Sequence, residues 1–361
     1  MVRFGVIINP ASRRMRKTGA IQRFKDVAKN YDVFFEETKF TENPTAELYK
    51  EPLKRLLEKK IDALLVCSGD GGHHLVDTAL FEMLGEKNMI PQANLRGGTM
   101  NVRAESAKLP RKNFRHFRWT TAEYALKKFL LAYGRKDPKE LKIENRTLIR
   151  IKTGDIEHLG FSYSSGFLVN FFDEYYSLGG AHVQALSLVA RSALSFPQQN
   201  GLLDSYLTST KGKVILNDEV LYENEYKWML LTSQDINMHF GILELAPKQL
   251  QDVNDTPTLR FIGSQETTKW ELVQQIPAIF NLKGVKRRNI KISDMTVVDV
   301  HKIEIIPEGK HRYLLDGDIY ETENPLLLEP AGPIPYLVLP PPLRKMIYKA
   351  IPKPFSKKLH I

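Results

Sequence analysis

The sequence predicts a two-domain α/β fold, with an N-terminal parallel-sheet, three-layer domain and a second, mostly antiparallel, β-sandwich-like domain. Strand-like and helical patterns alternate through the first 120 residues, which is typical of a parallel sheet covered by helices. From residue 141 onward, period-two alternation indicates antiparallel strands. The length of 361 residues also fits two domains.

The elements of the first domain follow from short apolar runs and from helical spacing. Strands are expected at residues 4–8, 33–37, 61–67 and 89–94, and helices at residues 18–29 and 45–59. A further helix after residue 72 has Leu75, Val76, Ala79, Leu80 and Met83 spaced to face a core.

The second domain is expected to consist of strands with two helices inserted between them. The strands are expected at residues 141–151, 157–163, 213–222, 226–232, 297–306 and 313–321, and the helices at 167–178 and 182–195. We therefore divide the chain into a nucleotide-binding domain (1–130), a β-rich substrate domain (131–330) and a basic, proline-rich tail (331–361) that docks on the first domain.

Three loops of the first domain, each following a predicted strand, are rich in glycine and small polar residues. They are Asn9-Pro10-Ala11-Ser12, Ser68-Gly69-Asp70-Gly71-Gly72 and Gly97-Gly98-Thr99-Met100-Asn101. Ligands bind at the carboxyl ends of the strands in an open parallel sheet. A glycine loop before a helix N-terminus presents backbone N–H groups that suit phosphate. Asp70 would repel phosphate unless it binds a cation or a proton, so its presence in this loop indicates a functional role.

These motifs resemble the catalytic domain of diacylglycerol kinases and their sphingosine-kinase and bacterial lipid-kinase relatives. The resemblance is carried by Asn9-Pro10-x-Ser12, Ser68-Gly69-Asp70-Gly71, Gly98-Thr99-x-Asn101-x-x-Ala104 with Pro110, Gly166-Phe167-Leu168-Val169-Asn170 and Leu315-Asp316-Gly317-Asp318. It spans residues 4 to 328, and the order and spacing of the motifs make it specific.

The resemblance implies an ATP-dependent lipid kinase that uses Mg²⁺ and phosphorylates a hydroxyl of a diacylglycerol- or sphingoid-like lipid. It implies that Asp70 and Asp318 are catalytic, that Asp318 also holds the metal, and that Gly166 and Asn170 contact the lipid. The residues that it places at the nucleotide are Asn9, Pro10, Ser12, Ser68, Gly69, Gly71, Gly72, Gly98, Thr99, Asn101 and Asp316.

The sequence departs from the family pattern at several of these positions. The family usually has Thr at Gly72, Asp at Val102, an acid at Asn170 and Glu at Asp318, and Pro-x-Gly in place of residues 96–98. Two alternative functions therefore stay open. One is a NAD-kinase-like phosphotransferase, which shares the Gly-Asp-Gly loop, and the other is a nucleotide- or lipid-binding homologue without turnover.

The net charge of +10 favours anionic partners. Nucleotide phosphates and an anionic membrane surface both fit, whereas no zinc-finger spacing or RNA-binding signature is present, so no nucleic-acid partner is expected. The segments expected to dock transiently on anionic lipid are Lys286-Arg287-Arg288 and residues 343–358. The oligomeric state stays open.

Cysteine usage and hydropathy indicate the compartment. The single cysteine, Cys67, is expected to pack in the core and fits a reducing environment. No stretch approaches 18 apolar residues, so no membrane span is expected. We therefore expect a cytoplasmic protein with peripheral attachment at the inner membrane surface.

Two further motifs have a structural interpretation. Asp316-Gly317 between two predicted strands is a strong hairpin-turn signal, which does not conflict with a role in the site. His73 and His74 follow the glycine loop and are expected to face solvent on the helix that begins there.

Overall fold

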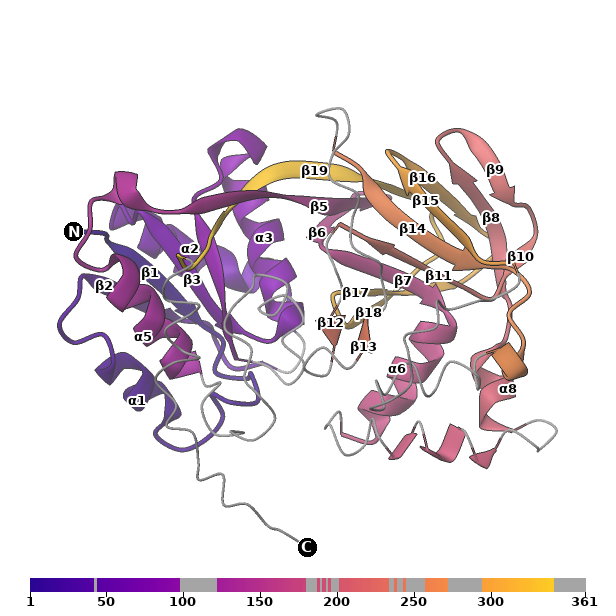
Figure 1. Ribbon diagram of the computed structural model, residues 1–361, viewed down its shortest axis with the longest axis horizontal. Coiled ribbons are helices and arrows are strands. Elements are labelled where there is room, and N and C mark those ends of the chain that lie inside the picture. Colours follow the sequence, from indigo (N-terminus) through magenta and orange to yellow (C-terminus); the bar gives the residue numbers. More distant parts are fainter. Residues whose placement is uncertain are drawn as a thin grey trace, which may run out of the picture.

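The computed structural model of the chain describes residues 1–41, 44–97, 122–179, 187–188, 190–192, 194–195, 201–233, 237–238, 243–244, 257–271 and 294–340. Figure 1 shows two domains side by side, bridged by the long strands β5 (Ile143–Thr153) and β19 (Leu326–Leu337). The predicted fold class is confirmed by this arrangement.

The first domain is built on four parallel strands. They are β1 (Phe4–Ile8), β2 (Val33–Glu37), β3 (Ala63–Ser68) and β4 (Gln92–Arg96), in the order β4-β3-β1-β2. The helices are α1 (Ala20–Asp26), α2 (Glu47–Glu58), α3 (Asp70–Leu84) and α5 (Ala122–Tyr133), with a short 3-10 turn, η1 (Glu86–Asn88), after α3. β1 and β3 are buried along their whole length, as expected for strands covered on both faces.

Helices cover both faces of this sheet and form two separate cores. One face packs residues of α1 and α5, such as Phe24 and Leu126, against Val6 and Leu65. The other face packs residues of α2 and α3 against Ile7, Leu64 and Val66. Successive strand residues therefore point into different cores, which is the alternation that a three-layer domain requires.

The second domain is a sandwich of two mainly antiparallel sheets. One sheet has the order β15-β14-β11-β7-β17-β18, with β15 (Thr296–Val300), β14 (Leu259–Ser264), β11 (Trp228–Thr232), β7 (Ser162–Gly166), β17 (His311–Leu315) and β18 (Asp318–Thr322). The other contains β5, β6 (Ile156–Gly160), β8 (Thr210–Leu216), β9 (Glu219–Tyr222), β10 (Glu225–Tyr226), β16 (Ile303–Pro307) and β19.

The smaller elements complete the domain. They are the helices α6 (Phe167–Ser177) and α8 (Leu202–Tyr206), the 3-10 turn η2 (Pro138–Glu140) and the short strands β12 (Asn237–Met238) and β13 (Leu243–Glu244). The first predicted helix, at residues 167–178, corresponds to α6, whereas much of the second lies outside the described residues.

Several predicted strands are each divided in the structure, among them residues 313–321, which form β17 and β18, and some strands were not predicted. Residues 213–222 form β8 and β9 around a turn at Asn217 and Asp218, both with positive φ, which these residue types tolerate. Residues 297–306 form β15 in one sheet and β16 in the other, because the chain changes sheets near residue 301. Strand β14 was not predicted.

Strand β19 joins the two domains into one continuous sheet. It pairs with β5 from Leu326 to Leu337, with β16, and in parallel with β4 through Tyr336 and Gln92. The predicted boundary between residues 330 and 331 falls inside this strand. Three prolines concealed the strand in the sequence, and one of them, Pro333, lies within a register shift between Ala331 and Ile334.

Candidate active site

The strand-end loops of the first domain meet at the carboxyl edge of its sheet, because β4, β3 and β1 are neighbours. The Gly97 N–H donates to Ser68 O at 3.0 Å, and the Arg14 N–H donates to Gly97 O at 3.2 Å. Gly98, Thr99 and Asn101, which were predicted to bind the nucleotide, lie outside the described residues.

Buried side chains hold the first two loops together. Asn9 Nδ2 donates to Tyr49 OH at 3.1 Å and approaches Ser68 Oγ at 3.4 Å, while Asn9 Oδ1 accepts the Ala11 N–H at 2.9 Å. Ser12 Oγ donates to Asn9 O at 2.8 Å. Burial raises the pKa of Tyr49 to about 12, so its hydroxyl stays protonated and can take part in this network. The buried side chains of Asn9, Ser12 and Ser68 therefore hold the two loops in place. Pro10, in the first loop, is partly buried.

The glycine loop leads directly into helix α3. Gly69 is the N-cap residue, and Asp70 is the first residue of the helix. The helix therefore presents its N-terminal backbone N–H groups at the loop, where phosphate is favoured. The side chain of Asp70 is not among those described.

Gly72 lies against the side chains that support the loop. A Cβ at this position would overlap Ser68 Oγ and would come within 2.8 Å of Tyr49 OH. The hydroxyl of Ser68 thus occupies the space that a side chain at residue 72 would need. This contact gives a structural reason for the departure from the family's usual Thr.

Asp318 reaches the glycine loop from the second domain. It begins β18, and a Cβ at Gly71 would overlap both oxygens of its carboxylate. The carboxylate also lies 3.1 Å from His74 Nε2, through Oδ2, and stays partly exposed. The positive end of the α3 dipole favours a carboxylate in this position. The loop of Asp70 and the acid of the second domain therefore share one site.

The prediction that His73 and His74 face solvent is wrong. Their exposed fractions are 2% and 0%. The second domain covers this face of α3, where Thr78 Oγ1 accepts the Leu159 N–H at 3.0 Å and Tyr320 OH lies 3.1 Å from His74 Nε2. The predicted apolar face of α3 is correct, since Leu75, Val76, Ala79 and Leu80 are buried.

Asp316 is engaged by the backbone of its own domain. Its Oδ1 accepts the N–H groups of Phe161 at 3.0 Å and Ser162 at 2.9 Å. Asp316 and Gly317 both have positive φ and join β17 to β18, so the predicted hairpin turn is confirmed. This geometry favours a structural role for Asp316 over the predicted nucleotide contact.

The two predicted lipid contacts lie at helix α6. Gly166 has a φ of +73° and precedes the helix, and a Cβ there would overlap Lys227 O, so glycine is required. Asn170 Nδ2 donates to Tyr206 O at 3.1 Å and ties α6 to α8. Their contact with a lipid stays a prediction.

Mg²⁺ is bound in proteins by oxygen ligands in a near-octahedral arrangement. Among the described residues, no group of three or more His, Cys, Asp or Glu side chains could hold a metal ion. Mg²⁺ often uses one or two carboxylates together with substrate phosphates and water. The partly exposed Asp318 fits such a ligand, whereas Asp316 does not, because backbone N–H groups occupy its carboxylate.

Sequence reasoning missed three residues of this region, Tyr49, His74 and Tyr320. Tyr49 lies within a correctly predicted helix, and no motif in the sequence singled it out. The contacts of His74 and Tyr320 join residues 246 positions apart, and no local pattern in the sequence signals such a pair.

The contact between Ser68 and Gly72 predicts that these two positions are coupled. Gly72→Ala should lower the free energy of unfolding by about 1–3 kcal/mol, because it overpacks the loop. Ser68→Gly should partly relieve this loss in the double variant, since it removes the overlapping hydroxyl. Urea denaturation of the two single variants and the double variant measures the coupling. Strictly additive losses would contradict the packing described here.

The hydrogen bonds of Asp316 predict a loss of stability when they are removed. Asp316→Ala leaves the N–H groups of Phe161 and Ser162 without their acceptor and should lower the free energy of unfolding by about 2–4 kcal/mol. Asp155→Ala, in an exposed turn, is the matched control and should change it by less than about 0.5 kcal/mol. Unchanged stability together with lost ATP affinity in Asp316→Ala would instead support the nucleotide contact.

Comparison with known proteins concerns the fold and the family of the first domain. No curated protein matches the sequence significantly. The fold is similar to that of a "putative diacylglycerol kinase" from Bacillus anthracis str. Sterne, with a TM-score of 0.59 and 16% identity, covering 94% of this chain and 98% of that chain. A second structure, of a diacylglycerol kinase from the same organism, gives a TM-score of 0.52 and 16% identity with the same coverage. Residues 3–127 match the family model of the diacylglycerol kinase catalytic domain, which confirms the predicted resemblance to that family.

Proposed function

We propose that this protein is an ATP-dependent lipid kinase that phosphorylates a hydroxyl of a diacylglycerol- or sphingoid-like lipid. The family match supports the lipid kinase class. The observation that carries the proposal is the position of Asp318, whose carboxylate lies against Gly71 of the glycine loop although it comes from the other domain.

Phosphoryl transfer depends mainly on positioning and on neutralising charge. In the proposed complex, the nucleotide phosphates bind the backbone N–H groups of the glycine loop at the N-terminus of α3. The carboxylate of Asp70 or Asp318 acts as the base that accepts the proton of the lipid hydroxyl. This role requires the carboxylate to lie within hydrogen-bonding reach of that hydroxyl. Mg²⁺, when bound, supplies positive charge to the phosphates, and Asp318 is the described side chain that would hold it.

The two alternative functions make different demands on the site. A homologue without turnover was suggested partly by Gly72, but the packing of Ser68 against this position gives a structural reason for the missing side chain. A NAD-kinase-like enzyme would share the loop but would act on a soluble dinucleotide. The acceptor therefore separates the two enzymatic functions.

Incubation of the protein with radiolabelled ATP and either a mixed lipid extract or NAD, followed by chromatography, tests the proposal. We expect labelled phosphate in a lipid product. ATP binding without a labelled lipid would support the homologue without turnover. Transfer of label to NAD but not to lipid would support the NAD-kinase-like alternative.

The two acids of the site should each be required for turnover. Asp70→Asn and Asp318→Asn keep the size of the side chain but remove its charge, and each should lower kcat by at least about 10²-fold, the scale of a positioned acid or base. Asp155→Asn, in an exposed turn, is the control and should keep wild-type kcat. Wild-type turnover in folded Asp70→Asn and Asp318→Asn proteins would contradict the assignment.

Access to a lipid substrate should depend on charge. No helix in the described part of the chain is long and apolar enough to cross a membrane. The two basic segments predicted to dock, residues 286–288 and 343–358, lie outside the described residues. Each Lys or Arg near an anionic surface contributes about 1 kcal/mol, and salt screens this attraction.

Sedimentation with vesicles that contain phosphatidylserine should therefore show binding that falls as salt is raised. Replacing Lys286, Arg287 and Arg288 with Gln should weaken this binding. Binding that ignores both the salt concentration and the content of anionic lipid would show that the positive charge serves another purpose.

A further inference from the structure

His74 is a buried histidine in direct contact with the proposed catalytic acid. It lies in the second turn of α3, and its exposed fraction is 0%. Its Nε2 atom is 3.1 Å from Asp318 Oδ2 and 3.1 Å from Tyr320 OH, both in β18. The ring of His158 closes the group, with its centroid 6.3 Å from that of His74 and 4.8 Å from that of Tyr320.

The surroundings of the ring indicate which nitrogen carries the proton. Nδ1 of His74 is buried and has no hydrogen-bond partner among the described residues. An N–H group at Nδ1 would lose its bond to water without compensation, which is costly for a buried donor. A bare Nε2 would moreover place its lone pair against a carboxylate oxygen. The neutral tautomer with the proton on Nε2 avoids both penalties.

The neighbouring groups leave Asp318 as the preferred acceptor. Burial, with a smaller contribution from His74, lowers the pKa of His158 to about 4, so that ring is neutral near pH 7. Burial and the nearby Asp318 raise the pKa of Tyr320, so its hydroxyl stays neutral as well. A carboxylate accepts a stronger hydrogen bond than a neutral phenol does.

We propose that His74 is a positioning residue for Asp318, whose Nε2–H donates to Oδ2 and holds the carboxylate against the backbone of Gly71. Because the ring is fully buried, it does not contact the substrate itself. The hydrogen bond crosses from the first domain to the second, so the contact that orients Asp318 also joins the two halves of the site. The effect on catalysis rests on the proposed kinase function, whereas the contact itself does not.

Two substitutions separate the donor from the bulk of the side chain. His74→Leu removes the donor but keeps an apolar side chain, and we expect kcat to fall about tenfold or more, the scale of a lost hydrogen bond to a charged group. The KM for ATP should stay within about twofold, since the nucleotide contacts are elsewhere. His74→Gln should recover part of kcat, because its Nε2 is separated from Cβ by the same number of bonds as in histidine.

His158→Phe is the matched control for the buried aromatic cluster. It keeps a ring beside Tyr320 without touching the bond to Asp318, and it should leave kcat near the wild-type value. Wild-type kcat in His74→Leu, or equal losses in His74→Leu and His74→Gln, would overturn the positioning role.

The ¹⁵N shifts of the histidine rings test the contact without any turnover. In wild-type protein, long-range ¹H–¹⁵N spectra should show His74, identified by its absence in His74→Gln, as the neutral Nε2–H tautomer. Asp318→Asn should shift its Nε2 resonance. A ring protonated on Nδ1 and not on Nε2, or a resonance that ignores Asp318→Asn, would overturn the contact. If the wild-type protein phosphorylates no lipid, the proposed function fails, and these spectra still decide the contact.

Discussion

The pairing of β19 with both domains is the constraint on which the site depends. β19 pairs with β5 along its whole length and reaches β4 at Tyr336, so one sheet passes through both domains. The core on the α3 side of the first sheet is likewise shared, because it includes Leu159 and Phe161 of the second domain. An apolar interface that is continuous with a core resists the relative motion that is otherwise expected between domains. Asp318 and Gly71 can therefore be held in contact.

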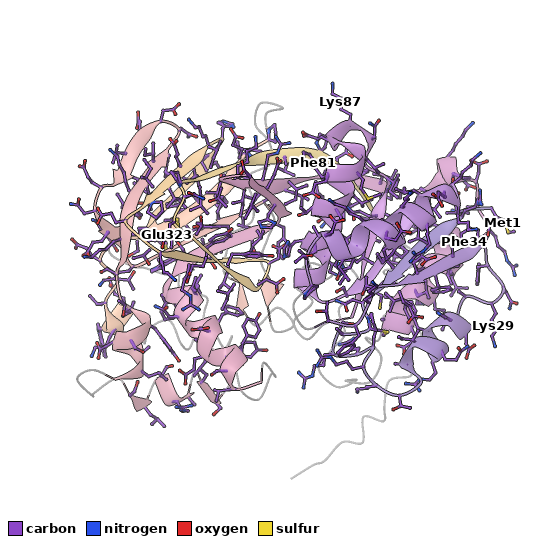
Figure 2. The ribbon with its side chains drawn as sticks, turned by 180° about the vertical axis from the view of Figure 1, so that it is seen from behind. Met1, Lys29, Phe34, Phe81, Lys87 and Glu323 are labelled. Carbon is purple, nitrogen blue, oxygen red and sulfur yellow. The ribbon has the colours of Figure 1, made fainter. Side chains whose placement is uncertain are left out.

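Polar contacts reinforce this junction at the far end of α3. Glu86 accepts the Gly332 N–H at 2.7 Å and pairs with Arg150 at 2.8 Å, and the Arg150 guanidinium lies over the Phe81 ring at 4.9 Å. Figure 2 shows Phe81 and Lys87 at this end of the first domain, beside the long strands. The helix is thus fixed to the second domain here, while its N-terminus faces Asp318. The N-terminal end of α3 therefore contacts β18, whereas the segment that follows its C-terminal end contacts β5 and β19.

The sequence allowed the local elements to be predicted better than their partners. The run ending at Cys67 and the apolar stripe of α3 are local signals that were predicted correctly, whereas α3 begins at Asp70, inside the predicted glycine loop. The burial of His74 could not be predicted, because β18, which contacts it, lies 244 residues away. Asp316 carries a clear turn signal, but only the fold shows that its carboxylate is used by Phe161 and Ser162. What is missed from sequence is mainly the contact between the domains.

The departures from the family pattern gain a physical interpretation from these contacts. The absence of a side chain at Gly72 accompanies a hydroxyl at Ser68 that fills the same space. Asp318 is shorter than the usual Glu, yet its carboxylate still contacts the loop at Gly71 and is bound there by His74. At both positions, the residue that differs from the family pattern contacts a side chain of another element: Gly72 contacts Ser68 of β3, and Asp318 contacts His74 of α3. Packing contacts therefore account for both departures within the described part of the site, so neither departure by itself argues against the proposed kinase function.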